Sequence, residues 1–184
     1  MCKLPDKIQA KNKTQLKRLI DYAFKHNIYD LNFIDTSKIT NMSNLFMNCE
    51  YDIDVSNWDV SNVTTTFCMF VGCKKFNSDL SNWNMANVKT TKYMFSGCKS
   101  FEGKGLENWN VSNVTDMTSM FAFCNKFDCD LSNWDVSNVT CMYFMFGHCK
   151  QFNCDLSRWN VSKVKDMKDM FTCCNILTIP NWYK

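Results

Sequence analysis

The sequence predicts an α/β repeat solenoid, with short parallel strands on one face, helical turns on the other and a helical cap at the N-terminus. Three observations predict it: a motif that recurs about every 25 residues, apolar columns in phase with it, and a change of apolar spacing within each repeat. The motif is Asp59-Val60-Ser61-Asn62-Val63, and its copies begin at positions 35, 59, 84, 110, 135 and 160. One such unit cannot bury its own apolar face, so neighbouring units are expected to stack.

Tryptophan, phenylalanine and cysteine each keep one position in the repeat, which predicts three buried columns. The predicted core residues are Trp58, Trp83, Trp109, Trp134, Trp159, Phe70, Phe95, Phe121, Phe146, Phe171, Cys73, Cys98, Cys124, Cys149 and Cys174. A free cysteine behaves as a small hydrophobic residue and is commonly buried, so reduced thiols are expected in this column. Disulfides between neighbouring coils are the alternative, because stacked coils lie about 5 Å apart, within the range of a bridge.

The apolar spacing changes within each repeat. Trp83-Asn84-Met85 alternates between apolar and polar residues, which is the spacing of a strand. Val114, Met117, Met120, Phe121 and Cys124 are spaced by three, three, one and three residues, which is typical of a helix. Each unit is therefore expected to contain a short strand, one or two helical turns and a returning loop.

The chain divides into residues 1–34, an N-terminal segment with a capping helix, and residues 35–184, six repeats followed by a truncated terminal copy. Apolar side chains between 12 and 26 fall on one face of a helix, at Leu16, Leu19, Ile20, Ala23 and Phe24. Asn12 with Gln15 resembles a capping box, and Asn27 is a plausible stop. This helix is expected to cover the first coil.

Composition indicates a folded chain rather than a disordered or fibrous one. The hydrophobic share is 46%, aromatic residues make up 15%, and Gly (5) and Pro (2) are scarce. The net charge of +3 says little about partners. No apolar run approaches the roughly 20 residues of a membrane span. The first 13 residues lack the apolar stretch of a secretory signal, which favours an intracellular protein unless a signal was removed.

Few residues have the pattern of a catalytic or metal site. The two histidines, His26 and His148, have no repeat partner, and Cys149 beside His148 belongs to the apolar column. Cys129 and Cys154 lie 25 residues apart in equivalent loops, which makes them the best candidates for a disulfide or an adventitious metal. A column of Asp54, Asp79, Asp130 and Asp155 is expected to cap turns rather than bind calcium. No enzymatic activity, cofactor or resident metal is expected.

Outward residues around each tryptophan predict a polar, amide-rich surface for a protein partner. The first column holds Asn57, Asn82, Asn108, Asn133 and Arg158, and the second holds Asp59, Asn84, Asn110, Asp135 and Asn160. Such columns can equally be amide ladders that serve only the fold. A lysine row at Lys74, Lys99 and Lys150 is expected to be solvated, and no nucleic-acid partner is expected because no Arg–aromatic interleaving accompanies it. Arg158 and Lys163 break the asparagine pattern in one coil and could mark a local site.

The run Phe127–Thr140 and its sequel ending Met145–Phe152 resemble the repeat of BspA-like leucine-rich-repeat surface proteins. The segments Lys13–Lys17 and Ile34–Ser43 also resemble the opening of these proteins. Within one repeat, Leu80-x-x-Trp83-x-Met85 is similar to the leucine-rich core pattern. The resemblance implies a leucine-rich-repeat-like solenoid used in adhesion or protein binding, often on a cell surface, without catalysis.

Together, these features predict a non-catalytic repeat scaffold for protein–protein interaction or adhesion. The alternative is a structural building block of a larger assembly, such as a virion or a cell envelope. The expected partner is a protein of unknown identity, without a membrane span, and copies could also assemble through the ends of the stack. The compartment stays open, because the missing signal favours the cell interior and the resemblance favours the surface.

Overall fold

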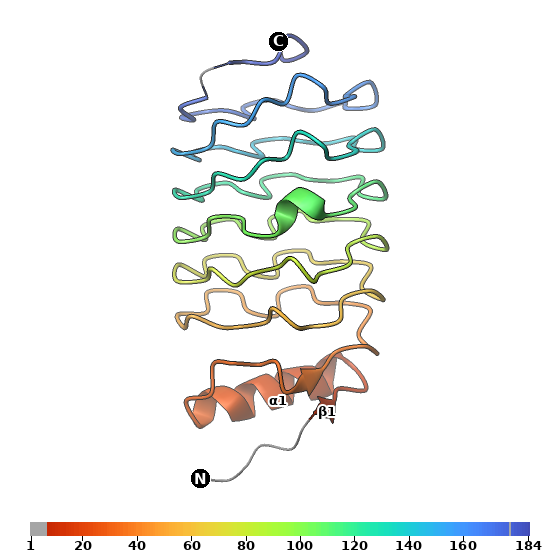
Figure 1. The fold of residues 1–184 in the computed structure, drawn as a ribbon, viewed down its shortest axis with the longest axis vertical. Helices are drawn as coiled ribbons and strands as arrows, with labels where there is room; N and C mark the ends of the chain where they lie inside the picture. Colours follow the sequence, from red (N-terminus) through yellow and green to blue (C-terminus); the bar gives the residue numbers. More distant parts are fainter. Residues whose placement is uncertain (1–6, 177) are drawn as a thin grey trace.

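The computed structural model describes residues 7–176 and 178–184, so residues 1–6 of the predicted N-terminal segment lie outside the described part. The repeats form coils that stack in sequence order, and each coil runs along one side of the stack and returns along the other (Figure 1). The side that carries the tryptophans, here called the Trp face, consists of residues 54–63, 79–88, 105–114, 130–139 and 155–164. The opposite side, here called the turn face, consists of residues 41–49, 65–73, 90–98, 116–124, 141–149 and 166–174.

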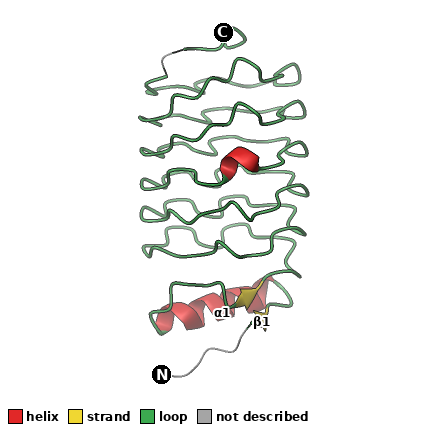
Figure 2. Ribbon diagram, viewed as in Figure 1, coloured by secondary structure: helices red, strands yellow, loops and turns green. Residues whose placement is uncertain are grey.

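The predicted α/β solenoid of strands and helical turns is wrong. Within the described ranges, the regular elements are helix α1 (Lys13–Lys25), a two-stranded parallel sheet of β1 (Ile8–Gln9) and β2 (Ile34–Asp35), and the 3₁₀ turn η1 (Leu106–Asn108). Nearly all of the stack is loop and turn, as Figure 2 shows. Neither the strand expected at Trp83–Met85 nor the helix expected at Val114–Cys124 is present.

Tight turns, rather than helices, produce the apolar spacing of three. Met94 N donates to Thr91 O at 2.9 Å, and Cys98 N donates to Phe95 O at 2.9 Å, so each turn places an apolar residue at its last position. The third residue of these turns, Tyr93 or Gly97, has a positive φ of 57° or 79°. A turn of this kind needs the left-handed conformation at that position, which interrupts any helix.

Neighbouring coils are joined on the turn face by hydrogen bonds that all run in one direction. Four amides of each coil donate to four carbonyls of the next, for example from Thr91, Tyr93, Phe95 and Gly97 to residues 116, 118, 120 and 122, at 2.7–3.1 Å. In a parallel sheet the donors of each strand point to both sides alternately. This one-way ladder leaves isolated parallel bridges, such as Thr90 with Asp116, and explains why the described residues of the turn face form no strands.

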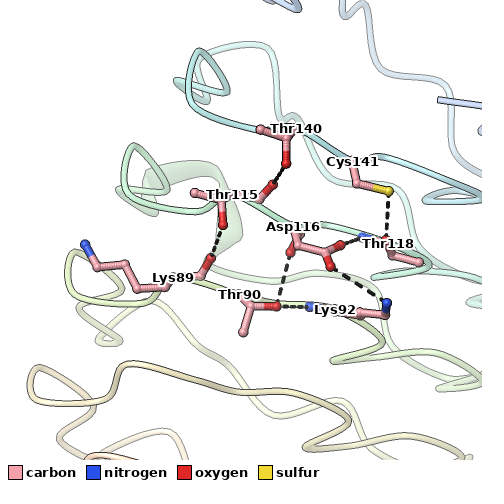
Figure 3. Close-up of polar contacts among 8 residues, drawn as sticks. All are labelled: Lys89, Thr90, Lys92, Thr115, Asp116, Thr118, Thr140 and Cys141. Carbon is pink, nitrogen blue, oxygen red and sulfur yellow. Dashed lines mark hydrogen bonds and ion pairs between the residues drawn. The ribbon is translucent and has the colours of Figure 1, made fainter. Parts of the chain in front are cut away.

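At the edge of the turn face, side chains add links between coils, and those of Thr115 and Thr140 run in the opposite direction (Figure 3). Thr115 Oγ1 donates to Lys89 O at 3.2 Å, and Thr140 Oγ1 donates to Thr115 O at 3.0 Å. Asp116 accepts a bond from Thr118 N at 2.9 Å and pairs with Lys92 at 3.8 Å. The threonines therefore connect three successive coils through their hydroxyl groups.

The core between the two faces is a set of stacked aromatic columns. Phe70, Phe95 and Phe121 are parallel to within 3°, with ring centroids 5.6 and 5.8 Å apart. Trp83 and Trp109 stack in the same way at 6.3 Å. The structure buries all of the core residues predicted from the sequence except Cys174, which is half-buried in the last coil. Burial of each aromatic side chain removes about 150–250 Å² from water.

Two columns also donate hydrogen bonds back to the preceding coil. The Trp109 indole N–H donates to Leu80 O at 3.1 Å, and its equivalents make the same bond along the stack. The Cys124 thiol donates to Phe95 O at 3.0 Å, and the other cysteines of the column follow it. Coils without regular strands leave backbone carbonyls in the interior, and these carbonyls need donors. Tryptophan and cysteine suit the two columns because each is largely apolar and carries one hydrogen-bond donor.

These buried thiols are expected to resist alkylation. All described cysteines are reduced, and burial raises the pKa of Cys98, Cys124 and Cys149, which removes the reactive thiolate. In the native protein at about pH 8, iodoacetamide should label the exposed Cys173 and leave Cys73 and these three unlabelled until guanidinium is added. Peptide mass spectrometry measures both states, and rapid native labelling of the four column cysteines would contradict the buried column.

Helix α1 lies against the first coil at the N-terminal end of the stack (Figure 1). Asn12 Oδ1 accepts from Gln15 N at 2.9 Å, and Gln15 Oε1 accepts from Lys11 N at 2.9 Å, so the predicted cap at the start of this helix is confirmed. The helix buries Leu16, Ile20 and Ala23. It ends before Asn27, which has a φ of 57°. Strand β1, which precedes the helix in sequence, pairs with β2 of the first coil.

Candidate functional site

The two polar columns predicted for partner binding lie together on the Trp face. All ten side chains are exposed: Asn57, Asn82, Asn108, Asn133, Arg158, Asp59, Asn84, Asn110, Asp135 and Asn160. Since that face has no strand, they flank turns rather than a sheet. The sequence pattern thus places them on one surface, although the backbone that presents them differs from the expected one.

The second of these columns caps its own turns. Asn84 Oδ1 accepts from Ala86 N at 3.1 Å, and Asp135 Oδ1 accepts from Ser137 N at 3.0 Å, with the same bond at the other members of the column. An Asx turn of this kind uses the side-chain oxygen to hold the backbone two residues on. These oxygens are therefore engaged in holding the turns of the fold.

The first column is less engaged. Asn82 Nδ2 approaches Asn57 Oδ1 at 3.5 Å, and Asn108 Nδ2 donates to Glu107 Oε1 at 3.4 Å. Arg158 lines an open pocket of about 590 Å³ with Cys129, Cys154 and Asp155. Lys163, the second basic residue of that coil, donates to Asn138 Oδ1 at 2.6 Å and so joins two coils.

The aspartate column beside this face caps turns, as the sequence predicts. Asp54, Asp79, Asp130 and Asp155 each accept from the backbone N–H of the serine two residues on, at 2.9–3.0 Å. Within residues 7–176 and 178–184, no three His, Cys, Asp or Glu side chains converge as a metal site would require. The carboxylates are accounted for by their turns.

Asp79 is expected to make the stability of the protein depend on pH below about 4. Its hydrogen bond to the Lys104 ammonium, 2.8 Å away, and a second to Ser81 lower the pKa of Asp79 to about 2. The pKa in the unfolded chain is higher, about 3.9, so the stabilisation is present above that value and is lost as the pH falls towards 2. Asp79→Asn keeps the cap, as Asn84 shows, but cannot titrate. Thermal melts followed by circular dichroism at low salt should show a smaller acid-induced decrease for the variant, and identical decreases would contradict this assignment.

Cys129 and Cys154 are brought to the same pocket by neighbouring coils. Cys154 Sγ lies 3.3 Å from Asp130 Oδ1, and Cys129 Sγ lies 3.8 Å from Glu107 Oε2. Burial, followed by the Glu107 carboxylate and the second thiol, raises the pKa of Cys129 to about 12, and burial raises the pKa of Cys154 to about 11. Both are free thiols, and thiols in this state are poor nucleophiles and poor metal ligands.

The turn face carries an aromatic cluster that the sequence interpretation missed. Phe123 stacks on His148 at 4.7 Å and lies 5.7 Å from Phe144, and Tyr143 follows at 6.1 Å from Phe144. Phe123 is 45% exposed and Tyr143 is 38% exposed. One or two coils away, Phe67 and Tyr93 pack edge to face at 6.3 Å. Large rings, exposed on two coils and half-buried on the other two, thus lie on four successive coils of this face.

Several of these rings stand at positions with left-handed backbone. Tyr93, Phe123, Phe144 and His148 have φ values of 57°, 62°, 54° and 62°. Asn44, Asn48, Gly72 and Gly97 occupy the equivalent positions in other coils, and Asn and Gly adopt this conformation with the least strain. The fold therefore favours a small residue where this chain carries a ring.

Residues 14–105 and 98–182 match the family described as Mycoplasma protein of unknown function, DUF285. The chain belongs to this family. No curated protein and no solved structure matches the chain. The two matched segments together run from helix α1 through the repeats, and the matched family differs by description from the BspA-like family that the motifs resemble.

In this DUF285 chain, none of the helices within the described residues is long and apolar enough to cross a membrane. The signal that could have revealed the aromatic cluster is its irregularity within the repeat. Positions 93, 123 and 144 hold rings, whereas most equivalent positions in other coils hold Asn, Gly, Ser, Cys or Asp. Side chains that depart from the repeat at exposed positions are candidates for a function other than stacking.

Proposed function

We propose that this chain is a non-catalytic repeat scaffold that binds a macromolecular partner, in protein–protein interaction or adhesion, as its resemblance to BspA-like surface proteins implies. The observation that carries the proposal is the exposed aromatic cluster of the turn face around Phe123 and Phe144. Aromatic side chains are enriched among the residues that dominate binding energy at protein interfaces. Contiguous exposed apolar surface of this kind commonly marks an interaction site.

Backbone strain supports a binding role for these rings. A bulky residue at positive φ is an unfavourable choice, and such choices concentrate at functional sites. Phe123 occupies the position that Gly97 occupies in the preceding coil. Nearly half of the Phe123 surface is exposed, so this part contributes no hydrophobic stabilisation to the stack. A ring that the stack does not require is most simply explained by a contact outside the molecule.

The arrangement of the histidines supports a non-catalytic role. His26, directly after α1, has its Nδ1 2.8 Å from Tyr22 O. His148 lies several coils away and stacks on Phe123. Cys149, next to His148 in sequence, points into the core and donates to Phe121 O at 2.9 Å. Neither histidine therefore stands beside an activated nucleophile of the kind that acid–base catalysis needs.

The proposal is tested by site-specific photo-crosslinking from the two faces. A benzoylphenylalanine at Phe123 should crosslink one partner in cells that express the full chain, whereas the same group at the exposed Asn133 of the Trp face should not. The same products from both positions, or none from Phe123, would contradict binding through the turn face. Crosslinks only between copies of the chain would instead support the building-block alternative.

A further inference from the structure

The turn face combines its aromatic cluster with a row of unpaired positive charges. Lys74, Lys99, Lys126 and Lys150 follow the turns of four successive coils, and all four are exposed. The ion pairs found in the described part of the chain, Lys92–Asp116 and Lys104–Asp79, involve none of them. Gly72 of the turn face lines one pocket with Lys74, which places the lysine row at the edge of this face.

Carboxylates follow the lysines on the same connecting segments, where the chain passes from the turn face to the Trp face. Asp128, Asp130 and Asp155 line one pocket there, and Asp52, Asp54 and Asp79 line another. Asp79, Asp128 and Asp155 stand two to five residues after the lysines of their coils, and Glu50 lines the pocket of Lys74. An anionic partner is attracted to the exposed lysines and repelled by these carboxylates, which favours docking on the turn face beside the lysine row.

We propose that the turn face binds an acidic polypeptide segment that also carries apolar side chains. This inference rests on the proposed function and specifies the partner of the same surface. The lysines attract the carboxylates of the segment, and the rings of Phe123, Phe144 and Tyr143 receive its apolar side chains. The apolar part of the face also includes the aliphatic Val71 and Met47. Aliphatic side chains suit the side chains of a polypeptide better than they suit nucleobases, which stack on rings.

The dimensions of the surface set the length of the segment. Equivalent rings in neighbouring coils lie 5.6–5.8 Å apart, so the lysine row spans about 17 Å over three steps. An extended chain advances about 3.3 Å per residue, so five or six residues reach from Lys74 to Lys150. A short linear segment is therefore long enough to meet every charge in the row.

The test uses the full chain and a phage-displayed library of random dodecapeptides. Selected peptides should be enriched in Asp and Glu together with apolar residues, and the best of them is then synthesised with a fluorescent label. Its binding, measured by anisotropy, should weaken at least tenfold when salt is raised from about 50 to about 500 mM, because exposed charges are screened. Enrichment of neutral or basic peptides would overturn the inference.

Two variants separate the two parts of the surface. Phe123→Gly with Phe144→Asn removes the rings, and Lys99→Gln with Lys126→Gln and Lys150→Gln removes the charges. Each should weaken binding of the labelled peptide at least tenfold. The matched control, Asn108→Gln with Asn133→Gln, changes exposed residues of the Trp face and should leave binding unchanged. Unchanged binding by the lysine variant would overturn the acidic partner.

Folding of the ring variant is expected to be preserved. Glycine and asparagine are the residues that other coils carry at these two positions, at Gly97 and Asn44, and both relieve the left-handed strain. The loss of ring packing opposes this gain, so the melting midpoint should stay within about 4 °C of the wild type. If the midpoint falls further, the lysine variant, whose exposed side chains make no ion pair in the described chain, decides the result alone.

The outcomes also distinguish this inference from the proposed function. Peptides that bind in a ring-dependent but charge-independent manner would refute the acidic partner and leave the turn face as the binding surface. Binding that neither variant changes would refute both. A labelled single-stranded 20-nucleotide DNA that binds more tightly than the selected peptide, and loses affinity in both variants, would replace the polypeptide with a nucleic acid.

Discussion

Trp109→Ala is expected to lower the free energy of unfolding by about 3–5 kcal/mol. Trp109 is 4% exposed, and its ring stacks between those of Trp83 and Trp134 at 6.3 and 6.4 Å. Its removal leaves a cavity in the middle of the stack and deprives Leu80 O of a donor. Equilibrium unfolding in urea, followed by circular dichroism, measures the loss.

The same variant should also divide unfolding into two steps, because each coil contacts only its neighbours and a weak centre uncouples the two halves. Trp109→Phe is the matched control, since it keeps a ring and loses the indole N–H. It should lose about 0.5–1.5 kcal/mol, the net contribution of one hydrogen bond, because Leu80 O keeps the bond from Trp83 N. A single transition at the wild-type midpoint for Trp109→Ala would contradict the role of the tryptophan column.

Gly105→Ala should destabilise the protein by at least about 3 kcal/mol. Gly105 precedes η1 and has a φ of 90°, which an alanine adopts only with strain. A Cβ at this position would also lie 2.6 Å from Ser81 Cα and closer still to Ser81 N, in the backbone of the preceding coil. Backbone atoms held in a stack cannot move aside as a side chain does, so thermal melts should show a large decrease in the melting midpoint.

Gly72→Ala provides the matched control for this effect. Gly72 also has a positive φ, of 72°, but its added Cβ would meet the end of the Asn48 side chain, which can rotate. Only the conformational strain of about 1–2 kcal/mol should therefore remain. Equal losses for the two variants would show that the contact with Ser81 does not limit the space at position 105.

Sequence reasoning reached the repeat and its buried columns, and it misjudged the backbone that carries them. Trp83, Phe95 and Cys98 keep their phase because each must meet its own kind in the next coil, and this requirement is visible as a fixed spacing. The left-handed turns were not visible in the same way. Asn44, Asn48, Gly72 and Gly97 mark some of them, whereas Cys68, Ser119 and Phe144 adopt the same conformation although their residue types do not indicate it. A spacing of three was therefore assigned to helices.

The candidate site was misjudged for a related reason. Regular columns such as Asn84 and Asp135 drew attention because they repeat, yet a residue that repeats in every coil is one that every coil needs, here to cap a turn. Phe123 and Tyr143 interrupt their columns and contribute less to the stack. The exposure of Phe123 depends on the direction in which its turn projects the third residue, and this direction follows from the left-handed backbone rather than from apolar spacing.

The one-way ladder has a consequence for how such a chain changes over generations. Every junction between coils uses equivalent amides as donors and equivalent carbonyls as acceptors. Recombination between two near-identical stretches of the gene that adds or deletes one whole unit therefore creates a junction of the same kind as the one it replaces. The molecule can lengthen or shorten by steps of about 5 Å without a new interface, while the exposed residues of each copy diverge independently.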